Sequence, residues 1–262
     1  MTSTTLPQSN RAGLAMIQFG GGRPVLLLHG VGLRAEAWHA QIDALSSEYL
    51  VIAPHMPGHG GSPCANTKNS LGDFADSYLP LLESLSEPAL IIGHSMGALI
   101  ALDLACRMPS HVCGVAALNG VFKRSAQATA AVQARASKLD GQQAPDPAPT
   151  LERWFGSAPS PARSACETWL RGADPAGYKR AYKAFASAQV PSEAALKTLS
   201  CPALFATGAL EPNSTPKMSH EMASLAPQGK AIIVDDAAHM MPMTHPAAVN
   251  KMLLEFAQEL RT

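Results

Sequence analysis

Short apolar runs alternate along this chain with segments whose apolar residues recur at helical spacing. The runs are rich in Val, Ile and Leu, are flanked by Gly and Pro, and lie at residues 24–30, 49–54, 89–93, 112–120, 202–208 and 230–236. Runs that are apolar throughout are typical of strands covered on both faces, as in a parallel sheet. The helical segments between them include residues 37–47, 71–86, 95–108, 219–226 and 246–260. This alternation predicts an α/β protein with a doubly wound, mostly parallel sheet.

The alternation is interrupted once, between residues 121 and 199. That segment is rich in Ala and helical in character, and it holds a large share of the aromatic side chains. A helical insertion between two strands predicts a cap, or lid, over the strand ends, where open α/β sheets bind their ligands. The alternative is that it only extends the core. We therefore expect an α/β core at residues 1–120 and 200–262 and a helical cap at residues 121–199.

Composition narrows the classes of partner. Lys plus Arg and Asp plus Glu number 20 each, so the formal net charge is zero. This balance does not favour nucleic acid or an anionic membrane surface, and we expect a small-molecule substrate, with homo-oligomerisation left open. The first residues lack the basic start and apolar core of a secretory signal, and the five cysteines form no CxxC pair or Cys/His cluster. These features favour a cytoplasmic protein without disulfides or a metal site.

A single serine lies where an apolar run becomes a helical segment. Residues 93–97 read GHSMG and match the nucleophile elbow G-x-S-x-G, with a predicted strand before Gly93 and a predicted helix from Ser95. Glycines on both sides allow a tight turn that lifts the hydroxyl of Ser95 above the sheet. The backbone N–H of Met96 would then face an oxyanion at a helix N-terminus. The alternative is an inert serine in a turn of small residues.

A nucleophilic serine needs a base and a second oxyanion donor. We choose His239 as the base because, among nine histidines, it follows the last predicted strand and precedes the last helix. The loop after residues 24–30 can supply the second backbone N–H, with Val31 as the first candidate. His29, at the end of that run, is interpreted as structural, hydrogen-bonded beneath the loop.

The orienting acid should follow the predicted strand at residues 202–208. Glu211 is the only carboxylate in the segment that follows, ALEPNSTP. A glutamate can hold the imidazole as an aspartate does, although its extra methylene requires a different backbone position. Asp235 and Asp236 are closer to His239 in sequence, but they are better explained by hydrogen bonds in a turn at a strand end.

The order of these motifs resembles the α/β-hydrolase family, esterase–lactonase type, over essentially the whole chain. The motifs are LLLHGVG, PGHGGS, GHSMGA, TGALEPNSTP and AAHMMPMTHP. The resemblance implies Ser95 as nucleophile, His239 as base and Glu211 as acid, with the Val31 and Met96 amides as the oxyanion hole. The fragments ERWF and GYKRAYKAFA are similar to caps of enol-lactonases such as 3-oxoadipate enol-lactonase. The sequence has Glu211 where the family usually has Asp, and His55 where it usually has another Asp.

These residues predict a serine hydrolase that cleaves a small carboxylic ester or lactone through an acyl-enzyme and needs no cofactor. Met240 beside the base and Trp154 and Phe155 in the cap are candidate walls of an acyl pocket, although packing between cap and core explains them equally well. Arg153 is a candidate partner for a substrate carboxylate, with an ordinary surface position as the alternative.

Three other functions remain open on the same scaffold. A carbon–carbon bond hydrolase would use the same triad, and a cofactor-independent lyase would use the serine only as a base. A binding protein that kept the fold but lost turnover is a third possibility. An acyl-enzyme on Ser95 would favour acyl transfer, whereas ligand-induced stabilisation without product would favour the binding protein.

Overall fold

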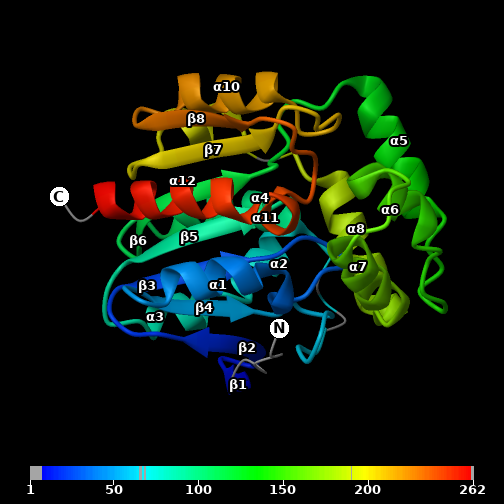
Figure 1. Ribbon diagram of the computed structural model, residues 1–262, viewed down its shortest axis with the longest axis horizontal. Helices are drawn as coiled ribbons and strands as arrows, with labels where there is room; N and C mark the ends of the chain where they lie inside the picture. The colour runs from blue at the N-terminus through cyan, green and yellow to red at the C-terminus, as the bar shows by residue number, and fades with distance from the viewer. Residues whose placement is uncertain (1–7, 65–66, 68, 190, 261–262) are drawn as a thin grey trace.

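The computed structural model describes residues 8–64, 67, 69–189 and 191–260. Within them, one eight-stranded sheet has the order β1-β2-β4-β3-β5-β6-β7-β8 (Figure 1). Strands β3 to β8 are parallel, and β2 is antiparallel to both of its neighbours. The strands are β1 (Gln8–Arg11), β2 (Leu14–Phe19), β3 (Pro24–Leu28), β4 (Leu50–Pro54), β5 (Ala89–His94), β6 (Val112–Leu118), β7 (Ala203–Gly208) and β8 (Gly229–Val234). The predicted mostly parallel sheet is confirmed.

Two strands at one side of the sheet, the edge strand β1 and its neighbour β2, were not predicted from the sequence. Strand β1 consists of Gln, Ser, Asn and Arg, and most of its side chains are exposed, so it has no apolar run. Strand β2 is partly exposed, and its buried and exposed residues do not alternate strictly. These two strands extend the sheet beyond β4 and lie far from the strand ends that carry the predicted site (Figure 1).

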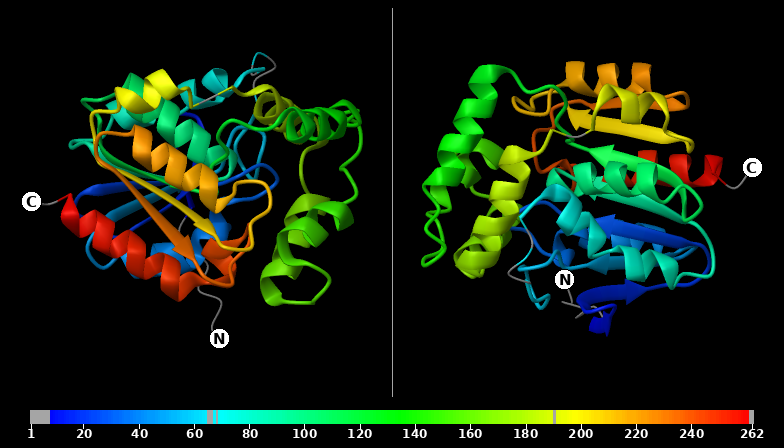
Figure 2. Two further views of the ribbon diagram at one scale, coloured as in Figure 1. Left: turned by 90° about the horizontal axis from the view of Figure 1, so that it is seen from above. Right: turned by 180° about the vertical axis from the view of Figure 1, so that it is seen from behind.

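Helices cover both faces of the sheet (Figure 2). One layer contains the short 3₁₀ helix η1 (Ala35–Trp38), α1 (His39–Leu45), α11 (Met241–Thr244) and α12 (Pro246–Glu259). The opposite layer contains α2 (Leu71–Asp76), α3 (Leu79–Glu83), α4 (Met96–Arg107) and α10 (Pro216–Leu225). Consecutive residues of β3 alternate between the layers, because Val25 and Leu27 pack in the first and Leu26 and Leu28 in the second. Both faces of the strand are therefore buried, which explains its continuous apolar run.

The helix expected at residues 71–86 is two short helices. Helix α2 ends at Asp76, and α3 begins at Leu79 with Pro80 in its first turn. Proline lacks an N–H and clashes with the preceding turn, so it interrupts a continuing helix but is tolerated at the start of a new one. The apolar period runs across the break because both helices bury the same face, through Phe74 and Leu81 among others.

Between β6 and β7 the described residues form five further helices. They are α5 (Ala126–Ser137), α6 (Ala148–Phe155), α7 (Pro161–Arg171), α8 (Pro175–Ser187) and α9 (Glu193–Lys197). Helices α5 to α8 stand beside the end of the sheet to which the parallel strands point (Figures 1 and 2). The division of the chain into core and cap stays a prediction. No helix in the described part of the chain has the length and apolarity that a membrane crossing requires.

Candidate active site

Ser95 lies at the turn between β5 and α4, and its backbone has φ 57° and ψ −117°. A positive φ is costly for a residue other than glycine and persists where the surrounding structure enforces it, as in a nucleophile elbow. A Cβ added to Gly93 would collide with the carbonyl of Gly97, and one added to Gly97 would collide with the carbonyl of Leu28. The two flanking glycines therefore allow the close backbone approach that the sequence pattern predicts.

His239 and Glu211 meet at the ends of neighbouring strands. Glu211 follows β7, His239 follows β8, and the Nδ1–H of His239 donates a hydrogen bond of 2.8 Å to Oε2 of Glu211. This bond places the proton on Nδ1 and leaves Nε2 free to accept another. Asp235 and Asp236, the alternative acids, are exposed. The structure thus brings the predicted base and the predicted acid together.

Glu211 is held as a carboxylate. Its side chain is buried, which by itself opposes ionisation, but Oε1 also accepts hydrogen bonds from the backbone N–H groups of Asn213 (2.7 Å) and Ser214 (3.3 Å). Burial raises the pKa of Glu211, but the hydrogen bond and charge of His239 and these backbone N–H groups outweigh it and set the pKa at about 2. At neutral pH the acid is therefore ionised and can stabilise a positive charge on the imidazole.

Two backbone N–H groups flank Ser95. Met96 is the first residue of α4, and Val31 lies in the loop after β3. Within the described residues neither N–H has a hydrogen-bond partner. A Cβ added to Gly30 would lie 3.0 Å from Cβ of Ser95, so the Val31 loop runs directly beside the serine. Both predicted oxyanion donors are thus unengaged and close to the nucleophile.

Three buried histidines support these loops. His29 donates from Nδ1 to the carbonyl of Gly30 (2.8 Å), and His59 accepts from the N–H of Gly32 at Nε2 (2.9 Å). His94 donates from Nε2 to the carbonyl of His239 (2.8 Å). Burial, aided by neighbouring histidine charges, lowers the pKa of His59 to about 4 and that of His94 to about 3, and it lowers the pKa of His29 well below its usual value. All three are therefore neutral at pH 7, as the bonds that His29 accepts from the N–H of Met56 and His59 from that of Gly32 require.

Acidification should destabilise the protein through these histidines. Between pH 6.5 and the lowered pKa values the unfolded chain binds more protons than the folded chain, so the free energy of unfolding falls as pH falls. For His59 alone the loss approaches about 3 kcal/mol by pH 4. We expect the melting temperature to be highest above pH 6.5 and to decrease steadily toward pH 4, and the exposed His220→Gln control to follow the same curve. A melting temperature that is constant from pH 7 to pH 5 would contradict this expectation.

A cavity of about 510 Å³ joins the predicted catalytic groups to the helical insertion. Ser95, His239 and Val31 line it, together with Arg153 and Trp154 of α6. The structure does not bring Phe155 or Met240 to this lining. Met240 is 1% exposed and packs in the core, while Phe155 packs against the same core cluster.

Two further arginines line this cavity and were not predicted. Arg124 follows β6 and Arg135 lies in the last turn of α5, and both share the lining with Arg153. Within the described residues no carboxylate forms an ion pair with any of the three. Nε of Arg135 instead donates to the hydroxyl of Tyr182 (3.0 Å), and Arg153 donates to the carbonyl of Pro149 (2.8 Å). Burial and the charge of Arg135 lower the pKa of Arg153, which nevertheless stays charged.

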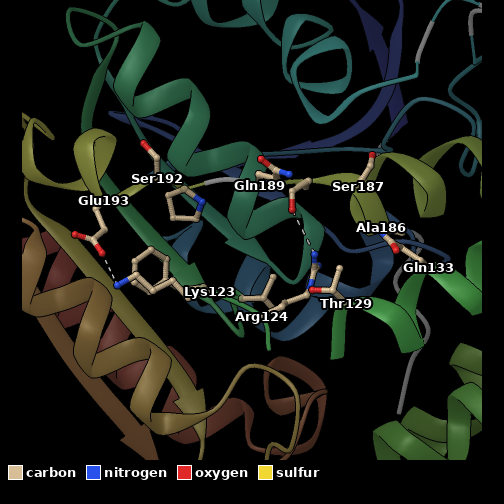
Figure 3. A pocket seen from close by; sticks show the side chains of 13 residues that line it. Lys123, Arg124, Thr129, Gln133, Ala186, Ser187, Gln189, Ser192 and Glu193 are labelled. Atoms are coloured by element: carbon tan, nitrogen blue, oxygen red, sulfur yellow. Dashed lines mark hydrogen bonds and ion pairs between the residues drawn. The ribbon is translucent and has the colours of Figure 1, made fainter. Parts of the chain in front are cut away.

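A second cavity, of about 370 Å³, adjoins the segment that follows β6 (Figure 3). Lys123 and Arg124 line both cavities. Figure 3 shows Lys123 paired with Glu193, and Arg124 directed to the carbonyl of Ala188 (3.4 Å). The charge of Lys123 is therefore compensated, and Arg124 is engaged by the backbone. Arg124, Arg135 and Arg153 therefore all lack a carboxylate partner among the described residues, and Arg135 and Arg153 are the two that line the Ser95 cavity alone.

Comparisons with known proteins agree with this fold. A model of the alpha/beta hydrolase family matches residues 25–252. The chain is 38% identical over 256 residues to (E)-2-((N-methylformamido)methylene)succinate hydrolase of Acinetobacter baylyi, and the match covers 97% of each protein. Two solved structures share the fold. A malate-bound esterase of Thermogutta terrifontis has a TM-score of 0.87 at 24% identity and covers 98% of this chain and 100% of its own. An enol-lactonase of Burkholderia xenovorans has a TM-score of 0.82 at 22% identity, with 96% and 100% covered.

Proposed function

Because the chain belongs to the alpha/beta hydrolase family, we propose that it is a serine hydrolase of small acyl compounds that carry a carboxylate group. The observation that supports this proposal is the meeting, in one cavity, of Ser95 and His239 with the uncompensated charges of Arg135 and Arg153. The first pair supplies acyl-transfer chemistry. The second pair selects an anionic substrate.

Ser95 is the nucleophile of the proposed reaction. Its Oγ attacks the substrate carbonyl while Nε2 of His239 takes the hydroxyl proton, and Glu211 stabilises the resulting imidazolium. The N–H groups of Val31 and Met96 bind the oxyanion, each contributing about 3 kcal/mol in comparable sites. The imidazolium protonates the leaving group, and the acyl-enzyme is then hydrolysed by a water that His239 activates.

Arg135 and Arg153 are the proposed carboxylate partners. Each guanidinium is partly removed from water, and each is near a like charge, so a bound anion would relieve an unfavourable interaction. A guanidinium also presents several N–H donors in a plane that matches a carboxylate. Both arginines line the same cavity as the nucleophile Ser95, so an anionic group of a bound substrate can meet this charge there.

The relative of Acinetobacter baylyi indicates which bond to test. Its name describes a succinate, which is a dicarboxylate, and an N-methylformamido group, which is an amide. Amide hydrolysis is therefore a second candidate beside ester or lactone hydrolysis. The ester or lactone interpretation, carbon–carbon cleavage and cofactor-independent lyase chemistry stay predictions that a substrate screen separates.

Charge selection is tested with two esters of matched length, 4-nitrophenyl hexanoate and mono(4-nitrophenyl) adipate. The six-carbon diacid is long enough that its carboxylate does not readily attack its own ester. We expect Arg135→Gln and Arg153→Gln each to lower kcat/KM for the adipate ester about 10-fold to 100-fold, which is the value of one charged hydrogen bond. The hexanoate ester should change by less than about threefold.

The matched control is Arg171→Gln. Arg171 is an exposed residue of α7 that pairs with Glu167 (2.7 Å), outside the cavity lining. We expect Arg171→Gln to leave kcat/KM unchanged for both esters. If Arg135→Gln and Arg153→Gln lower kcat/KM equally for the two esters, or leave kcat/KM for the adipate ester unchanged, the proposal of an anionic substrate is wrong.

The type of bond that the protein cleaves is tested with (E)-2-((N-methylformamido)methylene)succinate, the compound in the name of the Acinetobacter baylyi relative. Hydrolysis of its formamide adds water across the C–N bond and releases formate, which an enzymatic formate assay detects. Formate release that Ser95→Ala abolishes would support amide hydrolysis. Turnover of the adipate ester without formate release would favour ester or lactone hydrolysis.

A further inference from the structure

The imidazole of His239 has an aromatic neighbour from the helical insertion. The ring of Trp154, in α6, is stacked on that of His239 with 5.5 Å between centroids and 21° between planes. His94, the last residue of β5, donates from Nε2 to the carbonyl of His239 (2.8 Å). Its ring is tilted at 55° to that of His239, with centroids 4.9 Å apart. With Glu211, His94 and Trp154, the base has three described neighbours, and of these Trp154 alone comes from the insertion.

We propose that Trp154 is a positioning residue for the base: its indole fixes the plane of the His239 ring and favours the imidazolium that forms during attack. The inference rests on the proposed function, because it requires His239 to act as the base. It assigns Trp154 a role different from the acyl-pocket wall that the sequence suggested.

The hydrogen bond to Glu211 does not by itself fix the orientation of the His239 ring. One bond at Nδ1 restrains one edge of the ring but places no contact on its faces, so small changes in χ1 and χ2 still allow a limited rotation that displaces Nε2. The stacked indole blocks this rotation because it occupies one face of the ring. His94 has a complementary effect, since its bond fixes the backbone of His239.

The stack also distinguishes the two protonation states. When Ser95 transfers its proton to Nε2, the imidazole becomes a cation in contact with an aromatic face. Tryptophan has the most favourable face for a cation, whereas the contact with the neutral ring is weaker. An interaction that strengthens as the reaction proceeds raises kcat, and uniform binding does not.

This arrangement makes the base depend on the position of α6. Trp154 is the last but one residue of α6, which ends at Phe155 before Gly156, a residue with φ 68°. Arg153, the adjacent residue, is a proposed carboxylate partner. Binding of an anion by Arg153 would therefore act on the same turn of helix that carries the indole, and it would connect substrate recognition to alignment of the base.

The test compares Trp154→Leu, which removes the aromatic ring, with Trp154→Phe, which keeps an aromatic face for the imidazole to stack on. Two readouts are used: kcat and KM for mono(4-nitrophenyl) adipate, and the second-order rate at which a neutral fluorophosphonate labels Ser95. We expect Trp154→Leu to lower both kcat and the labelling rate about 5-fold to 20-fold, with KM changed less than about threefold. Trp154→Phe should recover most of both rates.

Trp169→Leu is the matched control. Trp169 lies on α7 of the same insertion, packs against the core and does not line the cavity. It should leave both rates unchanged. If Trp154→Leu does not fold, Trp154→Met, which keeps the bulk without the ring, replaces it.

An unchanged labelling rate in Trp154→Leu, or a change confined to KM, would overturn this inference while leaving the proposed function intact. The proposed function fails separately, if Ser95→Ala retains turnover and labelling. The two failures are therefore distinguishable in one set of variants.

Discussion

Ser95→Ala is expected to lower kcat for mono(4-nitrophenyl) adipate by about 10⁶-fold, the loss measured when the serine of a comparable triad is removed. The reason is that no other group at the elbow can form the acyl-enzyme. KM should change little, because Arg135 and Arg153 still bind the carboxylate. The measurement is steady-state release of 4-nitrophenolate by the purified variant.

The matched control is Ser224→Ala, on the exposed surface of α10, where the hydroxyl bonds only to the carbonyl of Glu221 (2.8 Å). It should have the activity of the wild type. If Ser95→Ala retains more than about one hundredth of the wild-type kcat, a serine nucleophile is the wrong assignment, since a remaining oxyanion hole alone gives far less.

Glu211→Gln is expected to lower kcat by about 10⁴-fold, the loss seen when a triad acid becomes an amide. Glutamine has the same size, but its neutral side chain cannot stabilise the imidazolium, and its NH₂ group can force the wrong imidazole tautomer. Glu211→Asp should also lose activity, by about 10-fold to 100-fold, because the shorter side chain withdraws the carboxylate from Nδ1 of His239. Both variants are measured on the same ester as Ser95→Ala.

Asp235→Asn and Asp236→Asn are the controls for this assignment. Both aspartates are exposed, and Asp236 has a φ of 55°, which asparagine also tolerates. Each variant should retain wild-type kcat. A loss in Asp236→Asn as large as that in Glu211→Gln would show that the orienting acid is misassigned.

The positions of the three candidate catalytic residues were predictable because each lies where a strand ends. Ser95, Glu211 and His239 follow β5, β7 and β8, and parallel strands present their carboxyl ends at one edge of the sheet. The apolar runs located those strands: β5 and β7 are buried along their whole length, and β8, at the edge of the sheet, is partly buried and still carries an apolar run. The order Ser, acid, His then selected His239 and Glu211 from the other candidates.

The substrate-binding side of the cavity was not predictable to the same extent. Arg135 lies on a helix whose sequence gives no sign that one turn faces a cavity, and its position depends on how α5 packs against α8. The contact between Trp154 and His239 joins residues 85 positions apart through the packing of α6. Periodicity identifies a helix and its apolar face, but it does not place that helix against a loop from another part of the chain.

The acyl-enzyme itself is the most direct test of the account. Wild-type protein mixed with mono(4-nitrophenyl) adipate, quenched at successive times and examined by mass spectrometry should carry one adipyl group per chain, mapped to Ser95. Ser95→Ala treated in the same way should carry none. Release of 4-nitrophenolate by the wild type without an adipyl group on Ser95 at any quench time would contradict the account.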